Sequence, residues 1–381
     1  MVGQPEAGRL PSLDLLRRMT DRHVLEALFD TELLTRPEIA ARTGLSRPTI
    51  SDSVRRLTQD GLVTTAGQQA GGRGRSGLQY RLNASAGAAL TVAVGARDVT
   101  VQVLDLSGQV GYERTEPVRR PISSRRLGTV ITQTVGQAVR SAVRSIQVCT
   151  VSLAAPVDQR TGLLVQLPDS PFLVSELDLR ALIGEVVETS VEIDNDVNWA
   201  ALAEHRLGAG VAVDGFCYCY LGAGLGAGLV LGGEVVHGAR GLAGELGHLQ
   251  TVGSGGRSRR LVECFADWGL TQPGTAAVDL GRLAAVLTGT TAPDRRRADA
   301  VIGAVAVAIS NLTAMLNPPM IIIGGPWSTI GNTADRIAER LHATAVVDTE
   351  VVSAVLGDDA ALAGARSEAV RVIRSLVMPM P

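Results

Sequence analysis

The chain contains no lysine. All 36 of its basic residues are arginine, and 38 acidic residues bring the formal net charge to −2. We attribute this absence to the base composition of a GC-rich coding sequence and draw no function from it. Cysteine is almost as scarce, and its few copies are scattered, which excludes a fold held together by a disulfide framework. The four cysteines are Cys149, Cys217, Cys219 and Cys264.

Long apolar runs are also missing. No uninterrupted apolar run reaches the roughly 18 residues of a membrane-spanning helix, and no stretch has the charged start and apolar core of a signal peptide. We therefore expect a cytoplasmic protein without a membrane partner. What the chain does contain is a hydrophobic content of 45 %, sufficient for a substantial core, and 43 glycines, which indicate many tight turns. At about 100–200 residues per domain, its length predicts two or three domains.

Residues 35–60 have the pattern of a helix-turn-helix. Thr35 is a suitable N-cap for a first helix, with Pro37 in the opening turn, where its missing N–H has no cost. Gly44 then marks a tight turn, and Ser46 is a suitable cap for a second helix. An N-terminal helix over residues 13–30 supplies apolar residues for packing on this unit or on a partner: Leu13, Leu16, Val24, Leu25 and Leu28.

The second helix of this unit has two distinct faces. Ile50, Val54 and Leu57 follow the i, i+4, i+7 spacing of a buried stripe. The other face carries short polar groups and guanidinium groups suited to base edges and phosphates. The alternative is a solvated amphipathic helix. The predicted DNA-binding residues on this helix are Arg47, Pro48, Thr49, Ser51, Asp52 and Arg55.

A glycine- and arginine-rich loop follows, where a winged helix places its β-hairpin wing. Arg73 and Arg75 lie between glycines, and we predict that they enter a minor groove, whose narrow A·T-rich stretches attract arginine. A flexible basic linker is the alternative. Residues 47–81 carry six arginines against two acids, about +4 net, in a chain of net charge −2. This asymmetry favours a regulator that contacts DNA at one end.

From Asn83 onward the sequence alternates between strand and helix patterns. Residues 90–96 and 99–110 have the pattern of paired strands, 127–146 that of a helix, and 149–158 that of a buried strand. Further strands are expected later in the chain, at 191–196, 216–236 and 320–325. Such alternation predicts a layered α/β architecture.

The order and spacing of several motifs resemble the ROK (repressor, open reading frame, kinase) family, which joins sugar kinases to regulators of sugar metabolism. The resemblance covers about residues 13–375, and within the family the chain is similar to regulators of the xylose- and N-acetylglucosamine-repressor type. Besides the winged helix, the motifs that carry it lie at residues 193–210, 220–248, 261–268, 316–325 and 358–365.

The resemblance implies the fold and the domain organisation. We expect a winged helix-turn-helix over residues 1–82, followed by a ligand-binding domain over 83–381 of the two-lobed actin/hexokinase/ribonuclease-H type. The small lobe would comprise about 83–195 plus the C-terminal helix, and the large lobe about 196–360. A ligand cleft would lie between the lobes.

The family's kinases open the first lobe with an Asp-x-Gly-Gly-Thr-Lys turn, whose carboxylate helps to hold the magnesium ion of the nucleotide. Here Ala93 takes the place of that Asp, and Asp98, five positions downstream, is expected to point elsewhere. Phosphoryl transfer depends on positioning and charge neutralisation, so we predict no ATP binding and no enzymatic activity. The second glycine-rich turn, Gly222–Gly228, is retained, either for nucleotide contact or because a tight hairpin requires glycine.

The sugar-binding positions of the family are all present. The resemblance implies that sugar hydroxyls are held by Asn195, Asp196, Glu245, His248 and Glu263. Carboxylates, an amide and an imidazole suit vicinal hydroxyls, each of which donates and accepts. In a kinase the match to Asp196 would be the general base; in this chain we predict a binding role only. The alternative for each residue is a capped turn or a satisfied core polar group.

Many relatives hold a structural zinc ion with a histidine and three cysteines, and this chain lacks those cysteines. Their positions are occupied by Ser254, Gly256 and Leu261, and Cys264 lies three residues too late. We therefore predict no zinc and no other cofactor. The same loop carries three arginines, Arg257, Arg259 and Arg260. They would attract an acidic or phosphorylated sugar. The alternative is that they are solvated residues of a surface loop.

Three functional hypotheses follow. The first is a transcription regulator, a repressor by default, whose affinity for a double-stranded DNA operator is controlled by a sugar or sugar phosphate. It would act as a homodimer or homotetramer, since helix-turn-helix proteins pair on palindromic half-sites. The second is an active sugar kinase with an appended DNA-binding domain. The third is a DNA-binding protein whose cleft is vestigial.

Overall fold

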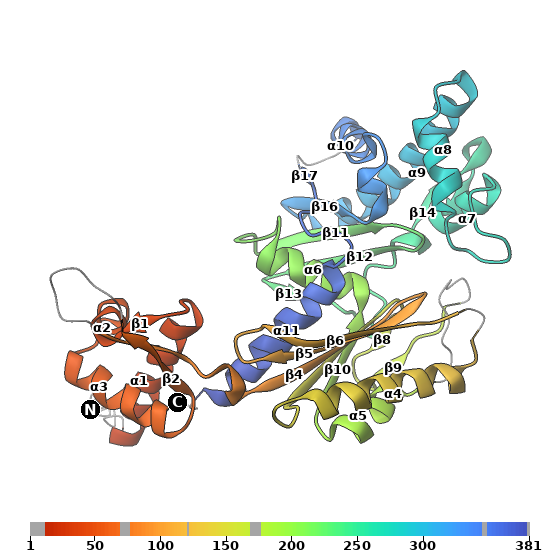
Figure 1. Cartoon of the computed structure of the whole chain (residues 1–381). Helices are drawn as coiled ribbons and strands as arrows, with labels where there is room; N and C mark the ends of the chain where they lie inside the picture. The colour runs from red at the N-terminus through yellow and green to blue at the C-terminus, as the bar shows by residue number, and fades with distance from the viewer. Residues whose placement is uncertain (1–11, 69–76, 120–121, 168–176, 345–348, 379–381) are drawn as a thin grey trace, which may run out of the picture.

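A computed structural model of the chain describes residues 12–68, 77–119, 122–167, 177–344 and 349–378. These residues form an N-terminal helical module followed by two lobes, each built on a five-stranded mixed sheet. Figure 1 shows the module at one end of the molecule and the two sheets one above the other, with helices between them. The predicted fold class, a winged helix-turn-helix followed by a two-lobed α/β region, is confirmed.

The N-terminal module combines three helices with a small antiparallel sheet of order β1-β3-β2. Its elements are α1 (Leu13–Phe29), β1 (Leu34–Thr35), α2 (Arg36–Thr43), α3 (Arg47–Gln59), β2 (Val63–Gln68) and β3 (Leu78–Leu82). Both predicted helix starts are present. The Glu38 carboxylate accepts from the Thr35 backbone N–H at 2.7 Å, and Ser46 Oγ accepts from Thr49 N–H at 3.3 Å. Gly44 ends α2 at φ 69°, a conformation that glycine adopts without strain.

The core of the module contains the predicted stripe. Ile50, Val54 and Leu57 of α3 are buried against three of the five predicted α1 residues, which are Val24, Leu25 and Leu28. Leu13 and Leu16 instead remain exposed near the start of α1. A buried polar contact also joins the two helices, because Asp21 accepts from Ser53 Oγ at 2.5 Å and from Arg56 Nη2 at 2.6 Å. Arg56 thus serves packing within the module.

The small lobe is built on a sheet of order β10-β7-β4-β5-β6, in which β10, β7 and β4 are parallel. Its helices α4 and α5 cover one face of the sheet, where Leu90, Val92 and Val94 pack on Leu127 and Ile131. Its elements are η1 (Ala84–Ala86), β4 (Ala88–Val94), β5 (Asp98–Asp105), β6 (Val110–Pro117), α4 (Ser124–Ser141), β7 (Val148–Leu153), β8 (Val157–Asp158), β9 (Leu163–Leu164), α5 (Leu179–Val187) and β10 (Val191–Asn195).

The large lobe is built on a sheet of order β13-β12-β11-β16-β17. The strands are β11 (Gly215–Leu221), β12 (Leu225–Leu231), β13 (Glu234–Val235), β16 (Met320–Gly324) and β17 (Glu350–Ser353), with a hairpin of β14 (Gln250–Val252) and β15 (Ser258–Arg260). The helices are α6 (Asp196–Leu207), α7 (Leu261–Asp267), α8 (Leu280–Thr288), α9 (Ala292–Leu316) and α10 (Thr333–Thr344), with short turns η2 (Leu246–His248), η3 (Ser254–Gly256) and η4 (Pro326–Thr329).

Helix α9 is the one helix in the described part of the chain whose length and hydropathy would allow it to span a membrane. Its apolar residues, among them Val301, Val305 and Ile309, are buried in the core of the large lobe together with Ile321 and Ile323 of β16. We therefore interpret α9 as a core helix of the large lobe. Its sequence contains Asp299 and Asn311, so no uninterrupted apolar run of spanning length occurs there.

Helices α6 and α11 (Ala360–Val377) fill the space between the two sheets and pack on each other. Their approach is close enough that a Cβ on Gly364 of α11 would overlap the carbonyl oxygen of Trp199 of α6. Trp199 is itself fixed to the small lobe, since its Nε1 donates to the carbonyl of Val151 at 3.0 Å. Gly364 therefore allows the backbone contact that brings the two helices together.

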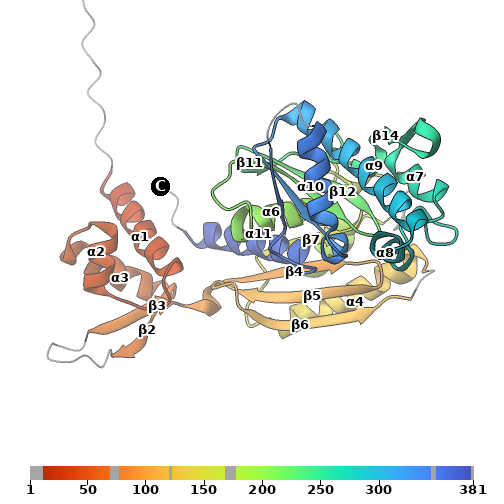
Figure 2. The same cartoon turned by 90° about the horizontal axis from the view of Figure 1, so that it is seen from above.

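The far end of α11 reaches the N-terminal module, as Figure 2 shows. Phe29 of α1 and Leu62 pack against the cluster that contains Leu106 and Ile373. The Arg374 guanidinium lies over the Phe29 ring, with its Cζ 4.6 Å from the ring centroid. A single helix thus contacts α6 near one end and the N-terminal module near the other.

Candidate functional site

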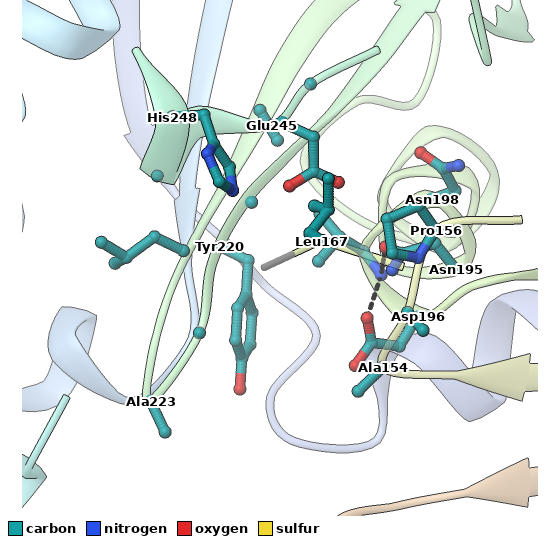
Figure 3. A pocket seen from close by; sticks show the side chains of 18 of the residues that line it. Ala154, Pro156, Leu167, Asn195, Asp196, Asn198, Tyr220, Ala223, Glu245 and His248 are labelled. Carbon is teal, nitrogen blue, oxygen red and sulfur yellow. Dashed lines mark hydrogen bonds between the residues drawn. The ribbon is translucent and has the colours of Figure 1, made fainter. Parts of the chain in front are cut away.

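A cavity of about 280 Å³ lies between the two lobes. The turn after β4, the end of β7, the first turn of α6 and the β11–β12 hairpin contribute to its wall, as does the segment 241–248. In Figure 3, Glu245 and His248 come from one side of the cavity, Asn195, Asp196 and Asn198 from the other, and Tyr220 stands between them. Four of the five predicted sugar-binding residues are therefore brought together.

The first turn of α6 supplies one side of the cavity. Asn195 is the N-cap of this helix, and its Oδ1 accepts from the Val197 N–H at 2.8 Å. The Asp196 carboxylate accepts from the same N–H at 2.9 Å. Burial raises the pKa of Asp196 to about 7, and the charge of Asp194 adds to the rise, while the hydrogen bonds from backbone amides oppose it. Among the residues that the structure describes, the Asn195 amide nitrogen has no hydrogen-bond partner and is available to a ligand.

The segment before η2 supplies the opposite side. Gly244 has a φ of 86°, and any Cβ there would overlap the Ala227 carbonyl, so glycine is required for this segment to lie on β12. Glu245 follows directly and lines the cavity. Burial raises the pKa of Glu245 to about 7, with a further contribution from the charge of Asp196. Two carboxyl groups that repel each other's charge thus face the same cavity.

Glu263, the fifth predicted residue, is not among the described residues that line the cavity. Its carboxylate accepts from Arg260 Nη2 at 2.8 Å, and this contact lowers its pKa. Arg260 Nη1 lies 3.4 Å from His248 Nδ1. Glu263 therefore contacts the site indirectly, through the arginine beside His248, and its role in ligand binding stays a prediction.

The segment that the family resemblance aligns with a zinc site carries groups here that do not suit a metal ion. Leu261 is buried, Cys264 Sγ lies 3.6 Å from the Arg260 carbonyl, and the Arg260 guanidinium occupies the neighbourhood of His248. Burial raises the pKa of the Cys264 thiol, which disfavours the thiolate that zinc requires. Within the described ranges, no group of three or more histidine, cysteine or acidic residues is placed to hold a metal.

The two glycine-rich turns are occupied by this chain's own groups. The Gly95 N–H donates to the Asp98 carbonyl at 2.9 Å. The Asp98 carboxylate lies over this turn, with its Oδ1 2.7 Å from where a Cβ of Gly95 would be, and Asp98 is not among the described residues that line the cavity. In the second turn the Gly222 N–H donates to the Gly224 carbonyl at 3.0 Å, and the Tyr220 ring packs against Gly222.

Two residues near the cavity, Asp194 and His237, were not predicted from the sequence. Asp194 is the second-last residue of β10 in the small lobe, and His237 follows β13 of the large lobe, yet His237 Nε2 lies 2.6 Å from Asp194 Oδ2. Asp194 Oδ1 also accepts from the Asn195 N–H at 2.7 Å and from Asn198 Nδ2 at 2.8 Å. This ion pair therefore joins the lobes directly behind the first turn of α6.

The His237–Asp194 pair makes stability depend on pH. Its hydrogen bond to Asp194 raises the pKa of His237 above the ordinary value, so its contribution is fully present below about pH 6.5 and is lost as the pH rises through the raised pKa. We expect His237→Gln to lower the free energy of unfolding by about 1.5 kcal/mol at pH 6 and much less at pH 9. Urea unfolding of both proteins at the two pH values measures this; an equal loss at both would contradict the assignment.

The predicted DNA-binding residues of α3 share one exposed or half-exposed face. Arg47, Pro48, Asp52 and Arg55 are exposed, and Thr49 and Ser51 are half-buried. The ion pair between Arg55 and Asp52, at 3.3 Å, is exposed on both sides and is therefore weak. Arg73 and Arg75 lie outside the described residues, so their predicted contact with a minor groove stays a prediction.

Comparisons with known proteins agree with this geometry. Residues 89–265 match the ROK family, and residues 18–64 match a winged helix-turn-helix DNA-binding family. The xylose repressor of Caldicellulosiruptor bescii is 23 % identical over 61 % of this chain and 59 % of its own length. The dual transcriptional regulator NagC of Escherichia coli is 25 % identical over 67 % of this chain and 62 % of its own length. The chain thus matches about three fifths of these relatives.

One solved structure is similar over almost the whole chain. It is a ROK family transcriptional regulator described as a homologue of the Escherichia coli Mlc protein, with a TM-score of 0.69 and 20 % sequence identity. The alignment covers 95 % of this chain and 98 % of that structure. At this identity the likeness establishes the arrangement of the winged helix-turn-helix and the two lobes.

Proposed function

Because this chain is a ROK family protein with an N-terminal winged helix-turn-helix, we propose that it is a transcriptional repressor whose operator affinity is controlled by a sugar or sugar derivative. One observation carries the proposal: the chain combines an exposed α3 face with a cavity between the lobes that is lined by Asn195, Asp196, Glu245 and His248, and α11 packs between the two regions. The names of the xylose repressor and NagC support the same assignment. We place the protein in the cytoplasm, where its DNA is.

The domain division that we propose is 1–82 for DNA binding and 83–381 for ligand binding. The small lobe would take about 83–195 with the C-terminal helix, and the large lobe about 196–360. The five sheets of the described residues support this division, because each is formed within one of these stretches.

In this proposal, a bound sugar changes operator affinity by changing the arrangement of the two lobes. Asn195 is the last residue of β10 in the small lobe, whereas Asp196, Glu245 and His248 belong to the large lobe. A sugar held by both sets favours one arrangement of the lobes, and α11 carries a change of arrangement to Phe29 of the DNA-binding module. A ligand controls the operator only if it binds one arrangement better than the other.

The direct test is fluorescence anisotropy of the full chain on DNA from upstream of its own gene, with and without a panel of sugars and sugar phosphates. Weakened or strengthened DNA binding with one sugar at micromolar to millimolar concentration supports the proposal. DNA binding that no sugar alters would favour the alternative in which the cleft is vestigial. Palindromic operators and a homodimer or homotetramer are expected.

Arg55→Ala should weaken operator binding by about tenfold and reduce the slope of log affinity against log salt by about 1, since one guanidinium contact is lost. Arg73→Ala should do the same if the wing enters the minor groove. Sugar binding should be unchanged in both. Arg125→Ala, an exposed arginine on α4, serves as the matched control. Unchanged operator affinity in both test variants would remove the winged helix from the mechanism.

An active sugar kinase remains the second candidate because of Asp196. Its pKa of about 7 suits a general base that takes a proton from a sugar hydroxyl. The two glycine-rich turns, which would bind the nucleotide phosphates in a kinase, argue against this candidate. Ala93 supplies no carboxylate for magnesium, and the Gly95 and Gly222 amides donate hydrogen bonds within their own turns. Sugar-dependent release of ADP from ATP by the purified protein would favour this candidate.

A further inference from the structure

The charges around the cavity are of one sign. Two carboxylates, those of Asp196 and Glu245, line it, and no arginine is among the described residues of its wall. The segment 168–176, which follows the lining residue Leu167, contains no arginine in its sequence. Arg240, next to the lining residue Gly241, is exposed to solvent.

Two of the three arginines that the sequence offered for an anionic ligand have other partners. Arg259 pairs with Asp267 at 3.4 Å, and Arg260 pairs with Glu263 at 2.8 Å. Neither lines the cavity, and neither does Arg257. A phosphate inside the cavity would therefore face two carboxylates without a guanidinium to neutralise it.

At each place where backbone N–H groups could bind a phosphate, one such group already has a partner. A helix N-terminus attracts anions through its free N–H groups, but at the start of α6 the Val197 N–H already donates to Asn195 Oδ1 and Asp196 Oδ1. The Gly95 N–H donates to the Asp98 carbonyl, and the Gly222 N–H donates to the Gly224 carbonyl. A phosphate at any of these three places would have to displace a hydrogen bond that the chain makes with itself.

The size of the cavity points in the same direction. Its volume of about 280 Å³ lies at the lower edge of the roughly 300–1,000 Å³ range of small-molecule pockets. The Tyr220 ring, packed on Gly222, takes up the space beside the second glycine-rich turn. What remains suits one monosaccharide, whose hydroxyls donate to Asp196 and Glu245 and accept from the Asn195 amide.

We infer that the cavity binds an uncharged, unphosphorylated monosaccharide and discriminates against the phosphate ester of the same sugar. The inference rests on the proposed function, because it narrows the chemical class of the ligand in the same cavity. Its physical basis is the pair of carboxylates, the lack of a facing guanidinium in the described wall, and the amide that is already engaged at each of the three candidate phosphate positions.

Calorimetric titration of the full chain tests this. The probes are aldopentoses, aldohexoses and N-acetylhexosamines, each paired with its terminal phosphate ester, at pH 8. Burial raises the pKa of both Asp196 and Glu245 to about 7, so a pH of 8 favours their ionised forms. We expect the ester of the sugar that binds to bind at least about tenfold more weakly than the sugar itself.

Glu245→Gln removes one charge and keeps the shape of the side chain, so it should reduce the ratio between the two affinities several-fold. Glu185→Gln, on the exposed outer surface of α5, should leave the ratio unchanged. The affinities of sugar and ester for the unmodified protein test the inference without any variant, so the test remains valid even if a variant folds poorly. An ester that binds as tightly as its parent sugar overturns the inference and leaves sugar sensing in place. A panel in which neither form of any sugar binds overturns the proposed function together with the inference.

Discussion

Glu245→Ala is expected to abolish the response to sugar while the unliganded protein stays on its operator. The Glu245 carboxylate lines the cavity and, among the residues that the structure describes, has no hydrogen-bond partner of its own. Its loss removes a charged acceptor for sugar hydroxyls and leaves the hydroxyls unpaired in the cavity. Since a hydrogen bond to a charged group contributes about 1.5–3 kcal/mol, loss of two such bonds weakens sugar binding by about 100-fold or more.

Two measurements on this variant separate binding from control. Titration calorimetry gives the sugar affinity, and anisotropy gives the operator affinity with and without sugar. Glu185→Ala on the exposed outer face of α5 is the control, with an unchanged sugar affinity and an unchanged response expected. If Glu245→Ala still responds at the same sugar concentration as the unmodified protein, the ligand binds elsewhere. Loss of operator binding without sugar would instead give Glu245 a structural role.

Gly364→Ala should cause the largest loss of stability among the single substitutions proposed. The added Cβ would overlap the Trp199 carbonyl oxygen, which is backbone and lies on a helix that is itself fixed to β7. The α6–α11 pair must then separate, with a cost of about 3 kcal/mol or more and a fall of several degrees in the unfolding midpoint. Scanning calorimetry measures the midpoint.

Gly303→Ala is the matched control for this substitution. Gly303 lies inside α9, and a Cβ there meets no atom within 4 Å. Because alanine is favoured over glycine in a helix interior by about 1 kcal/mol, this control should be neutral or stabilising. A similar loss in both variants would show that helix geometry, and not the contact with Trp199, determines the effect.

Local signals in the sequence were sufficient for much of the fold and of the site. Thr35, Ser46 and Gly44 predicted the limits of α2 and α3, because capping and αL geometry depend on residues only a few positions apart. Asn195, Asp196, Glu245 and His248 were predicted as members of short motifs, and the structure places all four around one cavity.

The parts that could not be predicted depend on contacts distant in sequence or on competition between neighbours. The Asp194–His237 pair requires the packing of one lobe against the other, which no local pattern describes. The position of Tyr220 follows from the register of β11 with β12, which places its ring on Gly222. Glu263 was predicted to bind ligand, yet Arg260 three residues earlier holds its carboxylate, a competition visible in the sequence once α7 is assigned.

Helix α11 also determines when the small lobe can complete its core during synthesis. The strands of that lobe are made early, but the face that carries Ala89, Leu104 and Val148 is covered by Ala369 and Ile373 of α11, which leave the ribosome after the whole large lobe. For that interval the nascent chain presents an uncovered apolar sheet face, together with Phe29 of the finished DNA-binding module. Exposed surfaces of this kind attract chaperones and favour aggregation, so synthesis that stops before α11 should yield insoluble protein instead of a smaller working regulator.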